Sequence, residues 1–219
     1  MKEIDWSNFS SGNKNGGNGA VSFLRFESGK TYRVRPFGNA VQYVKFFIAK
    51  GKPSVIVDAD DIEEVAKILS GHLGREVSPT FRNAMFVIER SDSGKVKILE
   101  GGKTIYDQFA SWSTEMNVKP GSGQGGDWKI KVEGEGVGGS NPRTYTTTYL
   151  GPVPFSDEEK KIISDLKEQG KLKLSSYLKE VTANKILEVV FGESSSEKEE
   201  PVAVTVPTVS TVSNIDIDW

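Results

Sequence analysis

Cationic and aromatic side chains alternate through residues 25–52 of this 219-residue chain. The stretch holds seven lysines and arginines against one acid, Glu27, and six aromatic residues lie among them. Cations pair with phosphates, and exposed rings stack on nucleobases for roughly 1–3 kcal/mol each. This composition therefore indicates a surface for single-stranded nucleic acid. The alternative is that the rings are core residues and the cations are ordinary solvated side chains, because aromatics also dominate cores.

The candidate contact residues lie on segments with the period of a β-strand. In residues 31–35, Tyr32 and Val34 alternate with Arg33 and Arg35, which gives one cationic face. Later strands of the same kind add further lysines and rings. We expect phosphate contacts from Arg33, Arg35, Lys45, Lys97, Lys129 and Lys131. We expect base stacking by Tyr43, Phe47, Tyr106, Trp128 and Tyr145.

Residues with catalytic or metal-binding chemistry are scarce. The chain has no cysteine and a single histidine, His72, which removes thiolate zinc sites and most histidine-based catalysis. The acids at 60–64 favour the start of a helix, so they need no metal to explain them. The glycine-rich loops at 121–126 and 134–139 lack the Gly-Lys-Ser/Thr ending of a phosphate-binding loop. We therefore expect no enzyme activity, no cofactor and no metal; a nuclease would need a carboxylate cluster that we cannot assemble.

Hydrophobic periodicity and turn residues predict several short strands with a few peripheral helices. Strands are expected at 20–26, 31–35, 41–49, 53–57, 84–90, 95–99, 127–133 and 143–150, and helices at 60–69, 103–112, 157–169 and 174–191. Residues 20–26 and 31–35 should pair, as should 84–90 and 95–99. Asp60 with Glu63 and Ser156 with Glu159 have the spacing of capping boxes. The pattern is mainly β with peripheral helices (α+β), typical of a five-stranded Greek-key barrel of the OB type, although the strand count alone also suits a sandwich.

Charge is divided unevenly between a body and two ends. Residues 1–19 are rich in Gly, Asn and Ser, and we expect a flexible arm. Residues 193–219 carry six acids and one base, so they account for −5 against a chain total of −2, and residues 1–192 carry +3. We expect 20–192 to form the domain and 193–219 a disordered acidic tail. Its end presents Asp216, Ile217, Asp218 and Trp219 to a partner's basic pocket, or to the basic groove of the domain itself.

Targeting and membrane signals are not visible in the sequence. No apolar run approaches the ~20 residues needed to span a bilayer, and the N-terminus lacks a basic region followed by an apolar stretch. We expect a soluble intracellular protein with no membrane contact.

An ordered series of motifs runs through residues 20–192. Lys30-Thr-Tyr-Arg-Val-Arg35 is followed by Phe86-Val-Ile-Glu-Arg-Ser-Asp-Ser-Gly-Lys-Val-Lys-Ile-Leu-Glu-Gly-Gly-Lys-Thr-Ile-Tyr106, then by Gly126-Asp-Trp-Lys-Ile-Lys-Val132 and Pro154-Phe-Ser-Asp-Glu-Glu-Lys-Lys161. In this order the chain resembles the single-stranded DNA-binding proteins of tailed bacteriophages, the OB-fold helix-destabilising proteins of phage replication. It departs from the zinc-containing branch of that family because it has no cysteine, and its arm is not basic.

The resemblance implies a function that the composition alone does not. It implies a protein that binds and protects single-stranded DNA, without strong sequence preference, during phage DNA replication, recombination or repair in the cytoplasm of the infected host cell. The acidic tail would recruit replication proteins such as polymerase and helicase-primase and compete for the DNA groove, and self-association on DNA is a further expectation. The alternative is a virion or scaffold interaction module, in which the tail binds a protein and the barrel has no DNA role.

Overall fold

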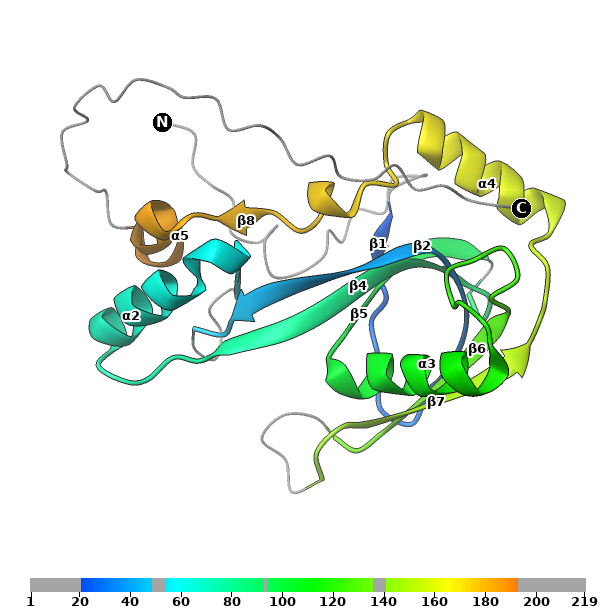
Figure 1. Cartoon of the computed structure of the whole chain (residues 1–219), viewed down its shortest axis with the longest axis horizontal. Helices are drawn as coiled ribbons and strands as arrows, with labels where there is room; N and C mark the ends of the chain where they lie inside the picture. The colour runs from blue at the N-terminus through cyan, green and yellow to red at the C-terminus, as the bar shows by residue number, and fades with distance from the viewer. Residues whose placement is uncertain (1–20, 49–53, 93, 136–140, 193–219) are drawn as a thin grey trace.

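The computed structural model describes residues 21–48, 54–92, 94–135 and 141–192 (Figure 1). Within these ranges the chain is a mixed α+β protein with an open sheet of eight strands and four α-helices. The predicted α+β class is confirmed, although the sheet has eight strands and not five. The predicted arm at 1–19 and tail at 193–219 lie outside the described residues. None of the described helices has the length and apolar character needed to cross a membrane.

Strand β2 (Thr31–Phe46) is the hub of the sheet. Strand β4 (Pro79–Glu89) pairs with one edge of β2 along most of its length. The other edge is divided between β6 (Asp127–Glu133), which pairs with residues 31–34, and β3 (Val55–Val57), which pairs with residues 44–46. These three ladders are all antiparallel. Because β6 pairs with the first residues of β2 and β3 with its last residues, β2 connects the part of the sheet that contains β6 with the part that contains β3.

The remaining strands extend the sheet outward from this hub. Strand β5 (Lys95–Gly101) pairs with β4, as the predicted hairpin requires, and β7 (Thr144–Gly151) pairs with β6. Two-residue strands lie at the margins and pair in parallel: β1 (Ser22–Phe23) with β5 and β8 (Glu180–Val181) with β3. The predicted pairing of 20–26 with 31–35 is therefore wrong, because the chain before β2 lies against β5 instead.

The predicted break between the strands at 31–35 and 41–49 is also wrong, because β2 continues through residues 36–40. The register between β2 and β4 shifts between Phe37 and Val41, which accommodates extra residues without reversing the chain. Gly38 takes a left-handed conformation (φ 69°), and its N–H donates to the Gly121 carbonyl at 2.9 Å. A Cβ on Gly121 would lie 1.8 Å from the Gly38 oxygen, so this close approach of two backbone segments requires glycine.

Local capping residues set the start of some helices. Helix α4 (Asp157–Glu168) begins at the predicted capping box, in which the Ser156 hydroxyl and the Glu159 carboxylate accept each other's backbone N–H. Helix α2 (Ile62–Leu73) follows a 3-10 turn, Ala59–Asp61, which is capped by Asp58, so the predicted cap at Asp60 is wrong. Helix α3 (Lys103–Met116) runs about one turn beyond its predicted end.

The predicted helix at 174–191 is wrong over most of its length. Two short 3-10 turns and β8 occupy residues 174–185, and only α5 (Ile186–Phe191) is α-helical. Tertiary contacts outweigh helix formation here, because β8 pairs with β3 and the Asp61 carboxylate accepts the Ala183 N–H at 3.0 Å.

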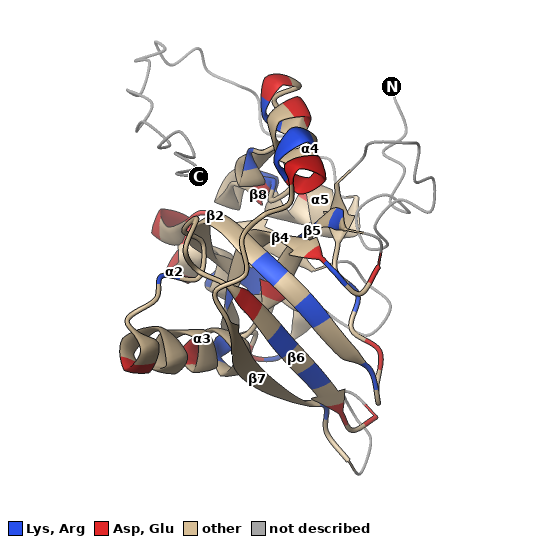
Figure 2. Cartoon of the chain, turned by 90° about the vertical axis from the view of Figure 1, so that its right-hand side faces the viewer, with Lys and Arg blue, Asp and Glu red and all other residues tan. Residues whose placement is uncertain are grey.

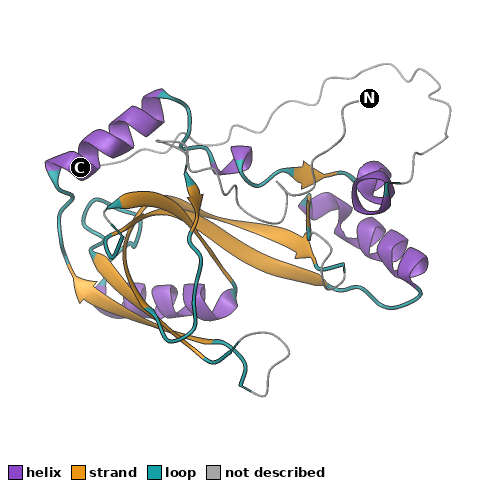
Figure 3. Cartoon of the chain, turned by 180° about the vertical axis from the view of Figure 1, so that it is seen from behind, coloured by secondary structure: helices purple, strands orange, loops and turns teal. Residues whose placement is uncertain are grey.

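Helices cover both faces of the sheet (Figure 3). Helix α3 packs on one face, on a core of Tyr32, Val34, Met85, Val87, Leu99, Ile105, Phe109, Trp128, Ile130 and Val132. Helix α4 and residues 171–178 cover the opposite face, on Phe37, Tyr43, Ala84, Phe86, Ile88, Val96, Ile98, Ile163, Leu166 and Leu174. Helices α2 and α5 bury the far end of β2, on Val44, Phe46, Ile48, Val57, Leu69 and Ile186.

Side chains of α3 satisfy the free edge of β7. Gln108 donates to the Tyr145 carbonyl at 2.8 Å and accepts the Thr147 N–H at 2.5 Å. The Trp112 indole donates to the Thr147 carbonyl at 3.0 Å. Helix α3 begins just after β5 ends, so it connects β5 with β7. Its side chains also block edge-to-edge pairing of β7 with another chain.

Candidate nucleic-acid interface

Trp128, predicted to stack on bases, is a core residue. Its register partner is Val34, which turns the indole toward α3, where it is fully buried. The ring packs edge-on against Phe109, with the centroids 4.6 Å apart, and its Nε1–H donates to the Gly125 carbonyl. The stacking prediction for Trp128 is wrong because no base can reach this ring in the folded protein.

Arg35, predicted to contact phosphate, is also fully buried. Its guanidinium donates to the carbonyls of Gly126 at 2.7 Å and Gly123 at 2.5 Å, and it lies 4.4 Å from the centre of the Phe155 ring. Burial lowers the pKa of Arg35, and the nearby Asp127 carboxylate opposes that effect. Arg35 therefore fixes the glycine-rich loop before β6, and the prediction of a phosphate contact is wrong.

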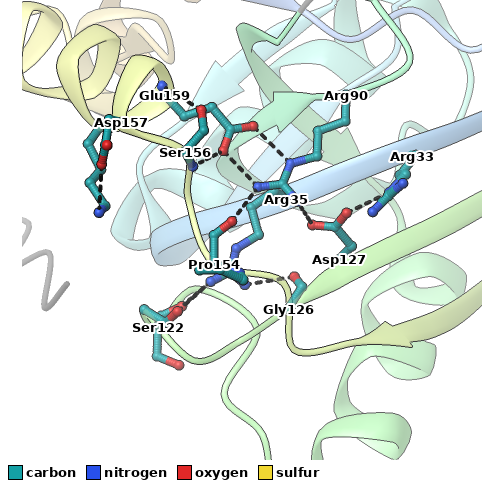
Figure 4. Close-up of polar contacts among 12 residues, drawn as sticks. Arg33, Arg35, Arg90, Ser122, Gly126, Asp127, Pro154, Ser156, Asp157 and Glu159 are labelled. Carbon is teal, nitrogen blue, oxygen red and sulfur yellow. Dashed lines mark hydrogen bonds and ion pairs between the residues drawn. The ribbon is translucent and has the colours of Figure 1, made fainter.

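Beside Arg35, a charged network joins β2, β4, β6 and α4 (Figure 4). The buried Asp127 carboxylate accepts from Arg33 Nε at 2.5 Å and from Arg90 Nη1 at 2.6 Å. Arg90 also donates twice to Glu159, at 2.8 and 2.7 Å, and once to the Pro154 carbonyl. Arg90 thus connects the first residue of β6 to the first turn of α4.

Glu159 has two structural roles in this network. Its carboxylate caps α4 by accepting the Ser156 N–H, and it accepts two hydrogen bonds from the Arg90 guanidinium. Burial favours the neutral acid, but the bonds from Arg90 and Ser156 outweigh it and leave the pKa of Glu159 below its ordinary value. The ionised carboxylate therefore holds α4 against the sheet.

Three predicted phosphate contacts, Arg33, Lys129 and Lys131, form an exposed group that we call the basic strip (Figure 2). Arg33 lies opposite Lys129 in the register, and Lys131 is two residues further along β6, on the same face. Arg33 is tied to Asp127, and Lys131 forms an exposed ion pair with Glu133 at 2.7 Å. The residues of β7 that pair with these two lysines are threonines, so the strip offers charge and hydroxyl groups without rings.

Four other predicted residues meet at the opposite end of β2. With two residues from β4 and β5 they make a cluster that we call the Phe47 site: Tyr43, Lys45, Phe47, Arg82, Glu100 and Tyr106. The Phe47 side chain is 49% exposed. Arg82 and Lys45 lie over its ring, 5.5 Å and 6.0 Å from the centroid. This is an accessible ring with two cations beside it.

The two tyrosines of the Phe47 site pack into different cores, Tyr43 into the core under α4 and Tyr106 into the core under α3. Tyr43 is buried opposite Arg82 in the register, so the prediction that its ring stacks on a base is wrong. Burial raises its pKa, and the Glu100 carboxylate, toward which its hydroxyl is directed, raises it further. Tyr106 is half-buried, its hydroxyl donates to the Leu99 carbonyl at 2.9 Å, and burial and Glu100 raise its pKa too.

Lys97 and Tyr145 belong to neither group. Lys97 donates to the Ser22 hydroxyl at 3.0 Å and lines a surface hollow of about 580 Å³ beside β1. Tyr145 packs edge-on against Phe26 on the side covered by α3. The tail residues Asp216, Ile217, Asp218 and Trp219 lie outside the described residues.

Arg82 and Glu100 are site residues that the sequence-based prediction lacks. Arg82 comes beside Tyr43 only through the pairing of β2 with β4, which residue spacing does not reveal. Glu100 reaches Lys45 across the intervening strand, at 2.9 Å. In the part of the chain that the structure describes, no group of three or more acids and histidines is placed to hold a metal ion.

Comparison of the chain with protein-family models and with curated proteins finds no match.

Proposed function

We propose that the protein binds single-stranded DNA without strong sequence preference and without catalysis. The observation that carries this proposal is the half-exposed Phe47 ring with Arg82 and Lys45 beside it. A base stacks on such a ring whatever its identity, and the flanking cations attract the adjoining phosphates. Stacking on a ring that already faces a guanidinium adds a cation–π contribution.

We further propose that the barrel half of the sheet is of the OB type. Its strands follow one another in the chain as β2, β4, β5, β6 and β7, with α3 inserted after β5, and they neighbour one another in the order β5-β4-β2-β6-β7. Helix α3 lies between the two outer strands of this order. OB folds present one barrel face and its loops to oligonucleotides, which fits the position of Phe47 at the start of a long connection between β2 and β4.

The proposed setting is phage DNA replication, recombination or repair in an infected cell, and it rests on the motif resemblance at residues 20–192. Recruitment of polymerase or helicase-primase by the tail, and self-association on DNA, stay predictions.

The test is the Phe47→Ala variant, titrated against fluorescein-labelled oligo-dT by anisotropy. Loss of one stacking ring should weaken binding by about 1–3 kcal/mol, which is roughly 5- to 150-fold. Phe81→Ala is the matched control: Phe81 is also exposed, at 55%, but it faces the other side of the sheet.

Phe81→Ala should leave affinity unchanged. Wild-type affinity in Phe47→Ala, or an equal loss in both variants, would remove the Phe47 site from the DNA interface. No binding of oligo-dT by the full-length protein at low salt would refute the proposed function itself.

A further inference from the structure

The Phe47 site contains two buried hydrogen-bond donors that lack a well-formed bond. Within the described ranges, Arg82 Nε has no acceptor, and the Tyr43 hydroxyl is directed toward the Glu100 carboxylate without the geometry of a hydrogen bond. Buried donors normally find acceptors, because leaving one unpaired costs free energy. Two such donors on facing residues of β2 and β4 indicate a place for an acceptor that binds from outside.

Glu100 lies at the centre of this arrangement. Its carboxylate forms an ion pair with Lys45 at 2.9 Å, and both side chains are mostly shielded from solvent. It reaches toward β2 over Ala84, its small register partner on β4, and it is close enough to Tyr43 to raise the pKa of that hydroxyl. Among the described residues of the site it is the negative group, and it cancels the charge of Lys45, which a bound phosphate would otherwise use.

The Arg82 side chain is held in place by the end of β5. Arg82 packs against Gly102, where an added Cβ would lie 3.2 Å from its Nη1. Its guanidinium is therefore held beside the residue that follows β5 and over the Phe47 ring. Lys45 pairs with the Glu100 carboxylate, and Tyr43 interacts electrostatically with both Glu100 and Arg82, so the three donors Lys45, Arg82 and Tyr43 come from two strands to the surroundings of Glu100.

We propose that Glu100 occupies a phosphate subsite, and that a backbone phosphate of single-stranded DNA replaces its carboxylate. The phosphate then accepts hydrogen bonds from Lys45, Arg82 and Tyr43 while the adjoining base stacks on Phe47. The displaced Glu100 side chain then rotates into solvent, past Gly101 and Gly102. This inference rests on the proposed function and adds to it a residue that weakens DNA binding, so that the strand is released readily.

The test is Glu100→Gln, which keeps the side-chain size and removes the competing charge. Affinity for oligo-dT should rise about tenfold, equivalent to about 1.4 kcal/mol. One more cation becomes available to phosphate, so the slope of log affinity against log salt should steepen by about 0.7. Glu133→Gln is the matched control, because Glu133 also pairs with a lysine, Lys131, but in the basic strip at 2.7 Å.

A second variant tests the hydroxyl. Tyr43→Phe in the Glu100→Gln background removes one donor and keeps the buried ring, and it should reverse part of the gain, by about threefold or more. Thermal unfolding of each variant establishes that it is folded.

Unchanged or weaker binding by Glu100→Gln, in a wild-type protein that does bind oligo-dT, would overturn the subsite and leave the proposed function standing. An equal gain in Glu133→Gln would also overturn it, because the effect would then be one of net charge. Absence of binding by wild type and Glu100→Gln alike would overturn both proposals.

Discussion

Replacing Asp127 with asparagine should destabilise the fold strongly while changing little of the side chain's shape. The carboxylate is fully buried and accepts from Arg33 and Arg90 at 2.5 and 2.6 Å. The amide would keep the volume and one acceptor, but within this network it would leave the positive charges of the three arginines, 33, 35 and 90, opposed only by Glu159. Uncompensated buried charge is among the few causes of large mutational effects.

The size of the effect follows from the exposure of the partners. Arg33 is half exposed, so solvent screens its pair with Asp127 and that contact contributes little. Arg90 is 13% exposed, and removing its buried partner should cost roughly 3–5 kcal/mol. For a domain of this size, each kcal/mol lowers Tm by about 2–4 °C, so Asp127→Asn should lower it by roughly 6–20 °C.

Circular dichroism during thermal and urea unfolding measures this change. Glu133→Gln serves as the control, since it breaks an exposed pair whose loss should cost less than about 1 kcal/mol. If Asp127→Asn unfolds within about 1 kcal/mol of wild type, the network does not hold α4 to the sheet as we infer. A loss equal to that of Glu133→Gln would lead to the same conclusion.

Two further variants test the core and the acid sensitivity of the fold. Trp128→Ala removes a buried ring that contacts Phe109 and Tyr149, so it should lose roughly 3–5 kcal/mol in urea unfolding yet keep its affinity for oligo-dT; a selective loss of affinity would contradict the core assignment. Glu159 has a folded pKa below its ordinary value of 4.5, so its stabilisation is present above about pH 4.5 and is lost as pH falls through the lowered pKa. Glu159→Gln should therefore be roughly 1–3 kcal/mol less stable than wild type at neutral pH and converge with it in acid, and a constant difference across pH would refute the role of its charge.

Elements specified by neighbouring residues could be predicted from the sequence. The hairpin of β4 and β5 follows from two strands and a short turn, and the start of α4 follows from Ser156 and Glu159. The continuity of β2 and the position of β1 could not be predicted, because both depend on partners far along the chain. Gly38 looks like a turn residue until the Gly121 loop is known to lie against it.

The candidate site could be predicted only in part, because some of its contacts also depend on residues far along the chain. Alternation in residues 127–133 places Trp128 with Ile130 and opposite Lys129, so the ring and the lysine cannot line one groove. This alternation is visible in the sequence, and it excludes the possibility that Trp128 and Lys129 both contact the same DNA strand. For Arg33 and Arg35 no such signal exists. They share a face of β2, and Arg35 is covered by the glycine-rich loop before β6 and by Phe155, which lie far along the chain.

The basic composition of residues 25–52 therefore overstates the number of cations available to the proposed DNA interface. Arg33 binds the buried Asp127, Arg35 binds loop carbonyls before β6, and Arg90 also binds Asp127, so all three arginines hold the fold together. Lys45 differs, because its partner Glu100 is partly exposed and stands next to an accessible ring. A charge paired with a fully buried carboxylate is committed to the fold, whereas a charge paired with a displaceable one can exchange partners. Because of that distinction, and not because of the number of cations, we propose the Phe47 site and not the basic strip as the place where single-stranded DNA binds.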